Sequence, residues 1–335
     1  MRLRLATTAV AVAVAVFAGM ARGAQGPVIF TIAGGASHGF SGDLGPATAA
    51  TLEGPAGLAV GPDGAIYVAD TIDQRIRRID AHGVIRTIAG NGRHGFGGDG
   101  GPAPQATFQD PTAIALGPDG SLYVADTGNS RVRVVRPNGI VGTIAGTADQ
   151  GFSGDGGPAA AAQVNGPAGV AVAGDGTVFF SDSGNNRVRA IRPDGTITTV
   201  AGAGTAGSGG DGGPATAAQL NAPAGLALAA DGGLLVADAG NGRVRRVGAD
   251  GRIATAAAGL ARPLDVAAVA GGGFVVAETG GNRVRTVTAD GSVLPLAGAG
   301  GPRFGGDGGS PVKALLNGPR AVELMPSGTE AVIAD

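Results

Sequence analysis

The sequence contains no cysteine and no tryptophan, and aromatic residues make up only 4% of its 335 positions. The absence of cysteine excludes disulfides, thiolate metal ligands and a thiol nucleophile. With so few aromatic side chains, a core must come mainly from valine, isoleucine, leucine and alanine. The net charge of −2 argues against a surface that follows nucleic-acid phosphates, so no nucleic-acid partner is expected.

A short apolar segment that ends in an acid recurs along the whole chain. Its first copy is IYVAD at residues 66–70, and the copies follow at intervals of 56, 56, 56, 40 and 57 residues. Regular self-similarity of this length is typical of a repeat architecture. The chain has 66 glycines, and they recur at fixed offsets between β-rich segments, which indicates turns rather than disorder. The closing acids are Asp70, Asp126, Asp182, Asp238, Glu278 and Asp335.

Each repeat contains four β-like segments joined by tight turns. In the first repeat these are residues 57–60, residues 66–70, residues 75–79 and residues 84–88. The Pro-Asp-Gly turn at residues 62–64 has the chemistry of a β-hairpin. Four short antiparallel strands, repeated about six times, predict a β-propeller.

These residues resemble the NHL-repeat family, whose repeats carry P-x-G-I-A-V, D-G-x-I-Y-V-A-D and N-x-R-I patterns. The segment PAGLAV at residues 55–60 and the following IYVAD match closely, and the resemblance covers nearly everything after Gly26. The longer repeats, which contain G-F-S-G-D-G-G-P-A, look like the bacterial and teneurin-type branch. The resemblance implies a propeller fold, but NHL propellers serve as sensors, RNA binders, adhesion modules and occasionally enzymes, so it does not decide function.

The glycine-rich segments are inserts in five of the six links between repeats. Each carries one acid and then a proline with a run of small residues, such as PAAAAQV at residues 158–164. Proline followed by alanine favours one or two helical turns, and Ser310 is a suitable N-cap in the last insert. The predicted fold is therefore all-β: a six-bladed β-propeller of four-stranded antiparallel blades, with short helical inserts on one face.

The two ends of the chain lead to three predictions. Arg2 and Arg4, an apolar run over residues 5–20 and small residues thereafter predict a signal peptide at residues 1–24, with cleavage after Ala21 or Ala24. The propeller then spans residues 25–335, with residues 28–33 as the fourth strand of the last blade. The third strand of that blade is missing after Asp335, so we expect the natural chain to continue.

The turns and inserts contain repeated charged residues that we assign to structure. An arginine follows each turn acid by five residues, and we expect each pair to brace its own turn. The acid in each insert is expected to close its own glycine-rich loop rather than bind Ca²⁺, which needs six to eight oxygen ligands. The turn pairs are Asp70/Arg75, Asp126/Arg131, Asp182/Arg187, Asp238/Arg243 and Glu278/Arg283; the insert acids are Asp43, Asp99, Asp155, Asp211 and Asp307.

The candidate binding residues are those that break the repeat. The link between the fourth and fifth repeats lacks the insert, and Arg262 and Asp265 stand there in place of glycine or alanine. Asp110 and Arg320 are similar departures before a first strand. No metal site or catalytic residue is predicted, because His38 and His94 lack a third ligand and no nucleophile motif is present.

The expected function is non-enzymatic binding of an extracellular protein, peptide or glycan on the insert-bearing face. The chain is expected to be exported by a bacterial cell to the envelope, periplasm or medium, without a stable membrane span and without a cofactor. One alternative is a propeller enzyme of the lyase or lactone-hydrolase type, which would need an unrepeated polar cluster with perturbed pKa values. The other is a spacer or sensor domain of a longer protein.

Overall fold

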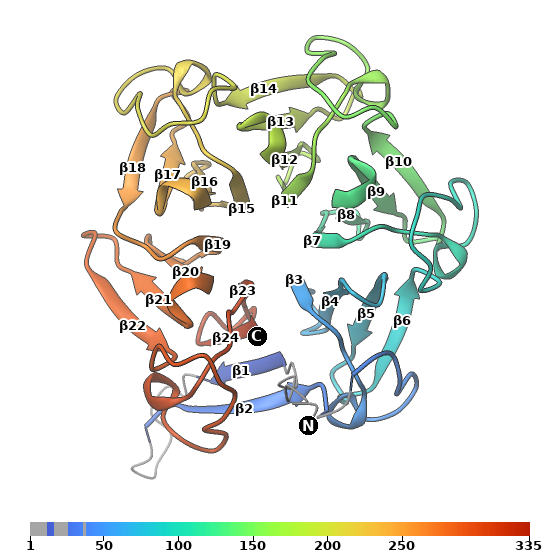
Figure 1. The fold of residues 1–335 in the computed structure, drawn as a ribbon, viewed down its shortest axis with the longest axis vertical. Helices are drawn as coiled ribbons and strands as arrows, with labels where there is room; N and C mark the ends of the chain where they lie inside the picture. The colour runs from blue at the N-terminus through green and yellow to red at the C-terminus, as the bar shows by residue number, and fades with distance from the viewer. Residues whose placement is uncertain (1–11, 17–25, 36–37) are drawn as a thin grey trace, which may run out of the picture.

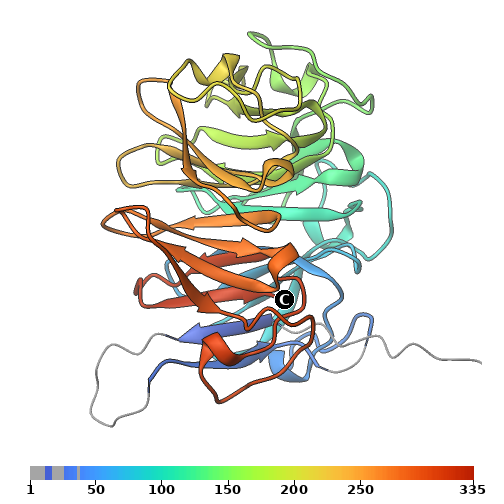
Figure 2. The same ribbon diagram turned by 60° about the vertical axis from the view of Figure 1, so that its left-hand side comes forward.

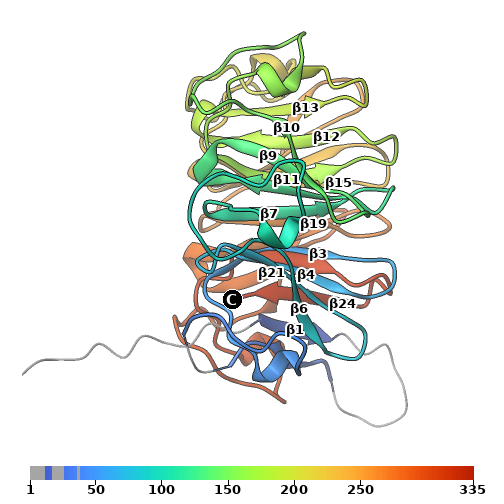
Figure 3. The same ribbon diagram turned by 90° about the vertical axis from the view of Figure 1, so that its right-hand side faces the viewer.

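The computed structural model describes residues 12–16, 26–35 and 38–335 of the chain. Figure 1 shows its four-stranded antiparallel sheets arranged as a ring around a central axis, six in number. The first strand of each repeat lies innermost and the fourth lies at the rim. Seen from the side, the sheets follow one another as layers (Figures 2 and 3).

Five of these sheets are blades made from one contiguous segment of four strands. Strand two pairs with strand three so that the turn acid lies opposite the arginine that begins strand three, as in Asp126 opposite Arg131. The five blades comprise β3 Pro55–Val60, β4 Ile66–Asp70, β5 Arg75–Ile79 and β6 Ile85–Ala89; β7 Pro111–Leu116, β8 Leu122–Asp126, β9 Arg131–Val135 and β10 Val141–Ala145; β11 Pro167–Val172, β12 Val178–Asp182, β13 Arg187–Ile191 and β14 Ile197–Ala201; β15 Pro223–Leu228, β16 Leu234–Asp238, β17 Arg243–Val247 and β18 Ile253–Ala257; and β19 Pro263–Ala268, β20 Phe274–Glu278, β21 Arg283–Val287 and β22 Val293–Ala297.

The prediction of six blades is therefore wrong: the repeat makes five, and a sheet of different origin closes the ring. This composite sheet has the order β2-β1-β24-β23. It contains β23 Ala321–Leu324, β24 Glu330–Ala334, β2 Val28–Ala33 and, in the third-strand position, β1 Val12–Val16. The two ends of the chain meet here, with β1 beside β24 in Figure 3. This sheet differs from the blades because β1, from an early part of the sequence, takes the third-strand position.

Apolar side chains of neighbouring sheets pack against each other around the ring. One core cluster joins Ala69 and Ile76 of the first blade to Val124 and Val141 of the second. Another joins Ile66 of the first blade to Val332 and Ala334 of the composite sheet. Because each inner sheet is covered on both sides, strand two is buried at almost every position, and valine, isoleucine and alanine suffice without tryptophan.

The inserts contain almost no helix, which corrects the prediction of helical inserts. Each has only one turn of 3₁₀ helix, because a run of about four small residues is too short to nucleate an α-helix. In the last insert, Ser310 makes no side-chain capping bond. These turns are η1 Ala47–Ala49, η2 Ala103–Gln105, η4 Ala159–Ala161, η6 Ala215–Ala217 and η9 Pro311–Lys313.

Each insert lies against the outer edge of a blade. In the first blade the N–H of Leu44 donates to the carbonyl of Ile85, and the N–H of Ile85 donates to the carbonyl of Gly45. The insert thus covers the open hydrogen-bonding edge of β6, which would otherwise be free to pair with another chain. Four further 3₁₀ turns join strands two and three, namely η3 Thr127–Asn129, η5 Ser183–Asn185, η7 Ala239–Asn241 and η8 Thr279–Gly281.

The predicted signal peptide spans residues 1–24, most of which the structure does not describe. Residues 1–11 and 17–25, which include both predicted cleavage sites, lie outside the described residues. Within the described ranges, no helix is long and apolar enough to cross a membrane.

Candidate active site: an acidic pair in the central channel

The third and fifth residues of the innermost strand of each blade line the central channel, together with Glu323 of β23 and some neighbouring residues of these strands. They enclose a cavity of about 310 Å³. Small residues occupy these positions because the strands approach closely: a Cβ on Gly169 would lie 2.2 Å from the carbonyl oxygen of Ala224. In the five blades these residues are Gly57 and Ala59, Ala113 and Ala115, Gly169 and Ala171, Gly225 and Ala227, and Asp265 and Ala267; the composite sheet contributes Glu323.

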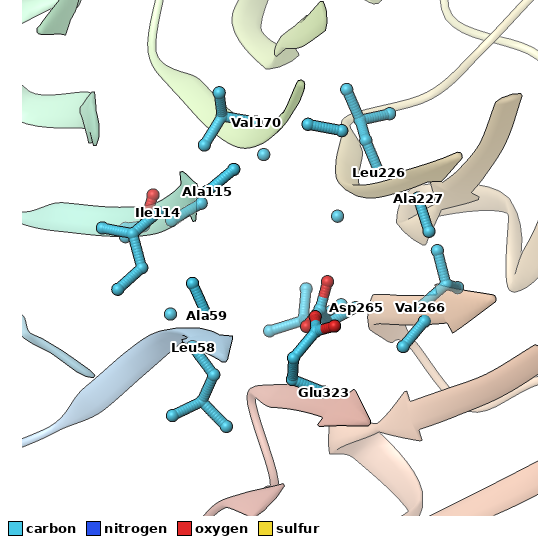
Figure 4. A pocket seen from close by; sticks show the side chains of 18 of the residues that line it. Leu58, Ala59, Ile114, Ala115, Val170, Leu226, Ala227, Asp265, Val266 and Glu323 are labelled. Carbon is cyan, nitrogen blue, oxygen red and sulfur yellow. The ribbon is translucent and has the colours of Figure 1, made fainter. Parts of the chain in front are cut away.

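Asp265 and Glu323 are the two carboxylates among the residues that line this cavity, and they come from the neighbouring innermost strands β19 and β23. Figure 4 shows both side chains directed into the cavity with their carboxyl groups close together. Oδ2 of Asp265 accepts a hydrogen bond of 3.0 Å from the N–H of Val322, which holds it across the gap between the two sheets. Its Oδ1 rests against Gly225, where an added Cβ would lie only 2.2 Å away.

The pKa values of both carboxyl groups are raised into the neutral range. Burial raises the pKa of Asp265 to about 7, although the N–H of Val322 acts in the opposite direction. Burial and the neighbouring Asp265 charge raise the pKa of Glu323 to about 8. Within the described part of the chain, neither forms an ion pair with a basic residue. The pair is thus acidic, partly desolvated and uncompensated.

The structure separates the four binding residues predicted from the sequence. Asp265 and Arg320 both line the channel cavity, and Arg320 is exposed. Asp110 and Arg262 instead take left-handed backbone conformations just before a first strand, with φ of 49° and 50°. Asp110 is engaged locally, because its Oδ1 accepts from Nε2 of Gln74 at 3.2 Å.

Sequence reasoning missed Glu323, although a signal was present. The fifth position of the first strand is alanine in all five blades, and Glu323 replaces that alanine in the composite sheet. The departures that the sequence pattern indicated lie before or near the start of the strand, whereas Glu323 lies near its end. The unrepeated polar cluster with perturbed pKa values that an enzyme would require is therefore present.

The turn acids pair differently from the prediction in four blades. The buried carboxylate of Asp126 contacts Arg133, seven residues on, at 3.2 Å, rather than Arg131. Arg131 and Arg133 are two residues apart and lie on the same side of β9. The second terminal nitrogen of Arg133 also reaches the insert acid Asp99, at 2.6 Å. Arg131 instead stacks on the ring of Phe96, 3.8 Å from its centroid. The arginines in this bridging position are Arg77, Arg133, Arg189 and Arg245.

The insert acids consequently hold the inserts to the blades rather than close their own loops. Asp99 accepts from Arg133 and, through Oδ2, from the N–H of Thr143 at 3.2 Å. Only the fifth blade, which lacks an insert, pairs its acid as predicted, with Glu278 bonding Arg283 at 3.0 Å. No group of three or more potential metal ligands occurs among the described residues.

Two sequence profiles match the chain. That of the teneurin NHL domain matches residues 36–95 and 138–209, and that of the NHL repeat matches residues 108–135 and 220–247. The chain belongs to the NHL-repeat family of β-propellers. Teneurin-4 of Homo sapiens is 34% identical to this NHL propeller over 230 residues, which are 61% of the chain and only 8% of teneurin-4.

Solved structures of similar fold include two whose names describe enzymes. A gluconolactonase from Xanthomonas campestris superposes with a TM-score of 0.58 at 14% identity, over 84% of this chain and 86% of its own. Virginiamycin B lyase from Staphylococcus aureus gives a TM-score of 0.51 at 16% identity, over 80% of this chain and 73% of its own. Identities this low show a shared propeller fold alone.

Proposed function

We propose that this NHL propeller is a binding module that takes a cationic group of a protein or peptide partner into its central channel. The observation that carries the proposal is the Asp265–Glu323 pair, two carboxylates that form no ion pair within the described residues. Apart from Arg320 and Thr112, the other residues that line their cavity are glycine, alanine and aliphatic residues. A propeller fold supports a binding role, and the similarity to teneurin NHL domains favours a protein partner.

The chemistry of the pair favours an ammonium or guanidinium group. Such a group would place its charge between two carboxyls that burial keeps protonated, and it would favour their ionised forms. Binding should therefore release protons and strengthen as the pH rises through about 7 to 8, the pKa values of the empty site. The cavity of about 310 Å³ is large enough for a lysine side chain but too small for a folded domain.

Butylammonium and its neutral analogue butanol are suitable probes of this site. Butylammonium should perturb the methyl NMR signals of Leu226 and Val266, which line the cavity, and should do so more strongly at pH 8.5 than at pH 6. Butanol should not show this dependence, and the Asp265→Asn/Glu323→Gln variant should lose it. Asp63→Asn, which removes an exposed turn acid, is the matched control. A channel that takes Ca²⁺ but rejects butylammonium would contradict the proposal.

Export of the chain is a separate part of the proposal. It rests on Arg2, Arg4 and the apolar run over residues 5–20. Expression of the full gene in a bacterial host, followed by N-terminal sequencing of the protein in the envelope and medium fractions, tests it. Protein that stays in the cytoplasm with its first residues intact would argue against export.

A second candidate, a propeller enzyme, is favoured by the same pair. Neighbouring carboxyls with pKa values of about 7 and 8 can supply a general acid and a general base at neutral pH. Hydrolysis of a lactone such as glucono-1,5-lactone that disappears in Glu323→Gln, and in no loop variant, would favour this candidate over the binding module.

A further inference from the structure

A second cavity, of about 550 Å³, lies between the fourth and fifth blades. Its walls come from strands β16, β17 and β18, from the turn between β15 and β16, and from the turns that follow β19 and β21. Among the described residues, it shares none of its lining with the channel cavity. The side chains that shape it include those of Asp231, Leu235, Arg246, Ala256 and Phe274.

The cavity exists because two positions that carry large side chains in other blades carry small ones here. The second residue of strand two is aromatic in the first three blades, but it is Leu235 in the fourth. The fourth residue of strand four is isoleucine or valine in those blades, but it is Ala256 in the fourth. The loss of a ring and of a branched side chain from one packed interface leaves a space. The larger residues, which pack against the next blade, are Tyr67 with Ile88, Tyr123 with Ile144, and Phe179 with Val200.

The first blade shows which polar groups accompany a phenol ring at this position. Tyr67 lies opposite Arg78, and its hydroxyl accepts a hydrogen bond of 3.3 Å from Nε of Arg78. The guanidinium also lies 5.8 Å from the centre of the Tyr67 ring. The same guanidinium contacts Asp63 of the neighbouring turn at 2.7 Å. A phenol side chain is thus held by an arginine whose position an acid fixes.

The fourth blade keeps this arginine and this acid, although it has leucine in place of tyrosine. Arg246 lies opposite Leu235 and lines the cavity. Its guanidinium forms an ion pair with Asp231 of the neighbouring turn, as in the first blade. The side chain of Arg246 is 39% exposed, against 18% for that of Arg78, so its N–H donors are more open to an incoming group. The groups that hold a phenol therefore stand beside a cavity at the position of the ring.

We propose that this cavity binds a small molecule that contains a phenol ring. The ring would lie against Leu235 and Ala256, and its hydroxyl would accept a hydrogen bond from Arg246. The turn at residues 271–273 forms part of the facing wall and consists of three glycines, so it leaves room for a substituent on the ring. A volume of about 550 Å³ is in the range of small-molecule sites. This site is separate from the channel, so the two proposals succeed or fail independently.

The probes for this site are 4-methylphenol, the analogue of a tyrosine side chain, and toluene, which lacks the hydroxyl. Both should perturb the methyl NMR signals of Leu235 and Val287, which line the cavity. Arg246→Met should lower the affinity for 4-methylphenol about tenfold and leave that for toluene nearly unchanged, because it removes the donor to the hydroxyl. Arg192→Met, at an exposed arginine outside the cavity, is the matched control and should change neither affinity.

Three results of this titration would overturn the proposal. One is a lack of 4-methylphenol binding to the unaltered chain, and another is an equal loss of affinity for both probes in Arg246→Met. The third is a set of shifts confined to Leu226, which would place the probe in the channel instead.

Filling the cavity tests the same site without changing its arginine. Leu235→Tyr supplies the aromatic residue of the first two blades, in register with Arg246, and should abolish binding of 4-methylphenol. Ala256→Ile supplies the aliphatic residue of the same blades and should weaken binding severalfold. Ala249→Ile, at an exposed turn residue outside the cavity, is the matched control. Unchanged binding to both filled variants, each shown by its melting temperature to be folded, would contradict a phenol site here.

Discussion

The guanidinium of Arg133 contacts the carboxylate of Asp126 at 3.2 Å, and neither side chain has any exposed surface. A third group, the partly exposed carboxylate of Asp99, contacts the same guanidinium from the insert. Burying a charged pair costs much of what its attraction returns, so the arrangement adds little net stability over an apolar core. The bridge instead holds the turn, the third strand and the insert in fixed positions relative to one another.

Removal of the bridging arginine should be costly. Arg133→Met would leave Asp126 as a buried, uncompensated carboxylate and should lower the free energy of unfolding by roughly 3–5 kcal/mol. The matched variant Arg131→Met loses a stack on Phe96 and should cost only about 1 kcal/mol. Urea unfolding of the two variants measures the difference. Similar midpoints for both would show that the buried bridge has no special role.

The carboxyl groups of Asp265 and Glu323 should make the fold less stable as the pH rises above neutral. Their pKa values are about 7 and 8 in the folded chain, above those of an unfolded chain near 4. A raised acid pKa means that folding favours the protonated form. Stability from these groups is therefore full below about pH 4 and is lost as the pH rises to about 8.

Asp265→Asn/Glu323→Gln should remove this part of the pH dependence. Its melting temperature should be close to that of the unaltered chain at pH 5 and exceed it at pH 8.5, where the folded chain must bury both ionised carboxylates. Thermal unfolding at both pH values provides the measurement. Asp70 and Asp335 also have pKa values raised to about 7, so the comparison with the variant, rather than the total pH dependence, is decisive.

Gly225 should be required for the position of the Asp265 carboxylate. A Cβ at this residue would lie 2.2 Å from Oδ1 and 2.6 Å from Cα of Asp265, so Gly225→Ala must shift β19 or turn the carboxyl away. We expect a loss of about 1–3 kcal/mol in stability and loss of butylammonium binding. Gly174→Ala is the matched control, because nothing lies within 4 Å of its Cβ position. Equal behaviour of the two variants in urea unfolding and probe titration would contradict this account.

Two acids in equivalent positions should respond to substitution with opposite sign. Asp126→Asn removes one of the two carboxylates that face the buried Arg133 and should destabilise the fold by about 2 kcal/mol or more. Asp335 has no arginine among the described residues and a pKa of about 7, so Asp335→Asn should stabilise the full chain at pH 8.5 and have little effect at pH 5. Melting temperatures at these two pH values test the contrast. A destabilising Asp335→Asn at pH 8.5 would show that its carboxylate is already compensated.

The local structure was largely predictable because each strand and turn depends on only a few neighbouring residues. The strands from Pro55 to Ala297 lie where alternating segments and Asp-Gly turns predicted them, since a turn needs only its own few residues. The inserts were predicted less well. Their proline and alanine residues favour a helical start, but contacts with the rim strands, such as Leu44 with Ile85, stop the helix after one turn.

The residues of the candidate site could be recognised only by comparing equivalent strand positions in different blades. Asp265 stands out in the sequence as a departure from glycine, whereas Glu323 stands out only when its register opposite Val332 places it in the channel. The pairing of Asp126 with Arg133 rather than Arg131 also depends on where the folded insert brings Asp99 and Phe96, which residue spacing alone does not reveal.

The sequence by itself determined the NHL-repeat propeller, its strands and its turns, because these follow from periodicity and local backbone chemistry. Only the tertiary structure decided three other features: the composite closing sheet, the arginine bridges and the acidic pair in the channel. Each of them joins residues that are far apart in the chain, such as Asp265 with Glu323 in the channel and Asp99 with Arg133 in a bridge. Their proximity is set by how the ring closes, and ring closure is a property of all the sheets together.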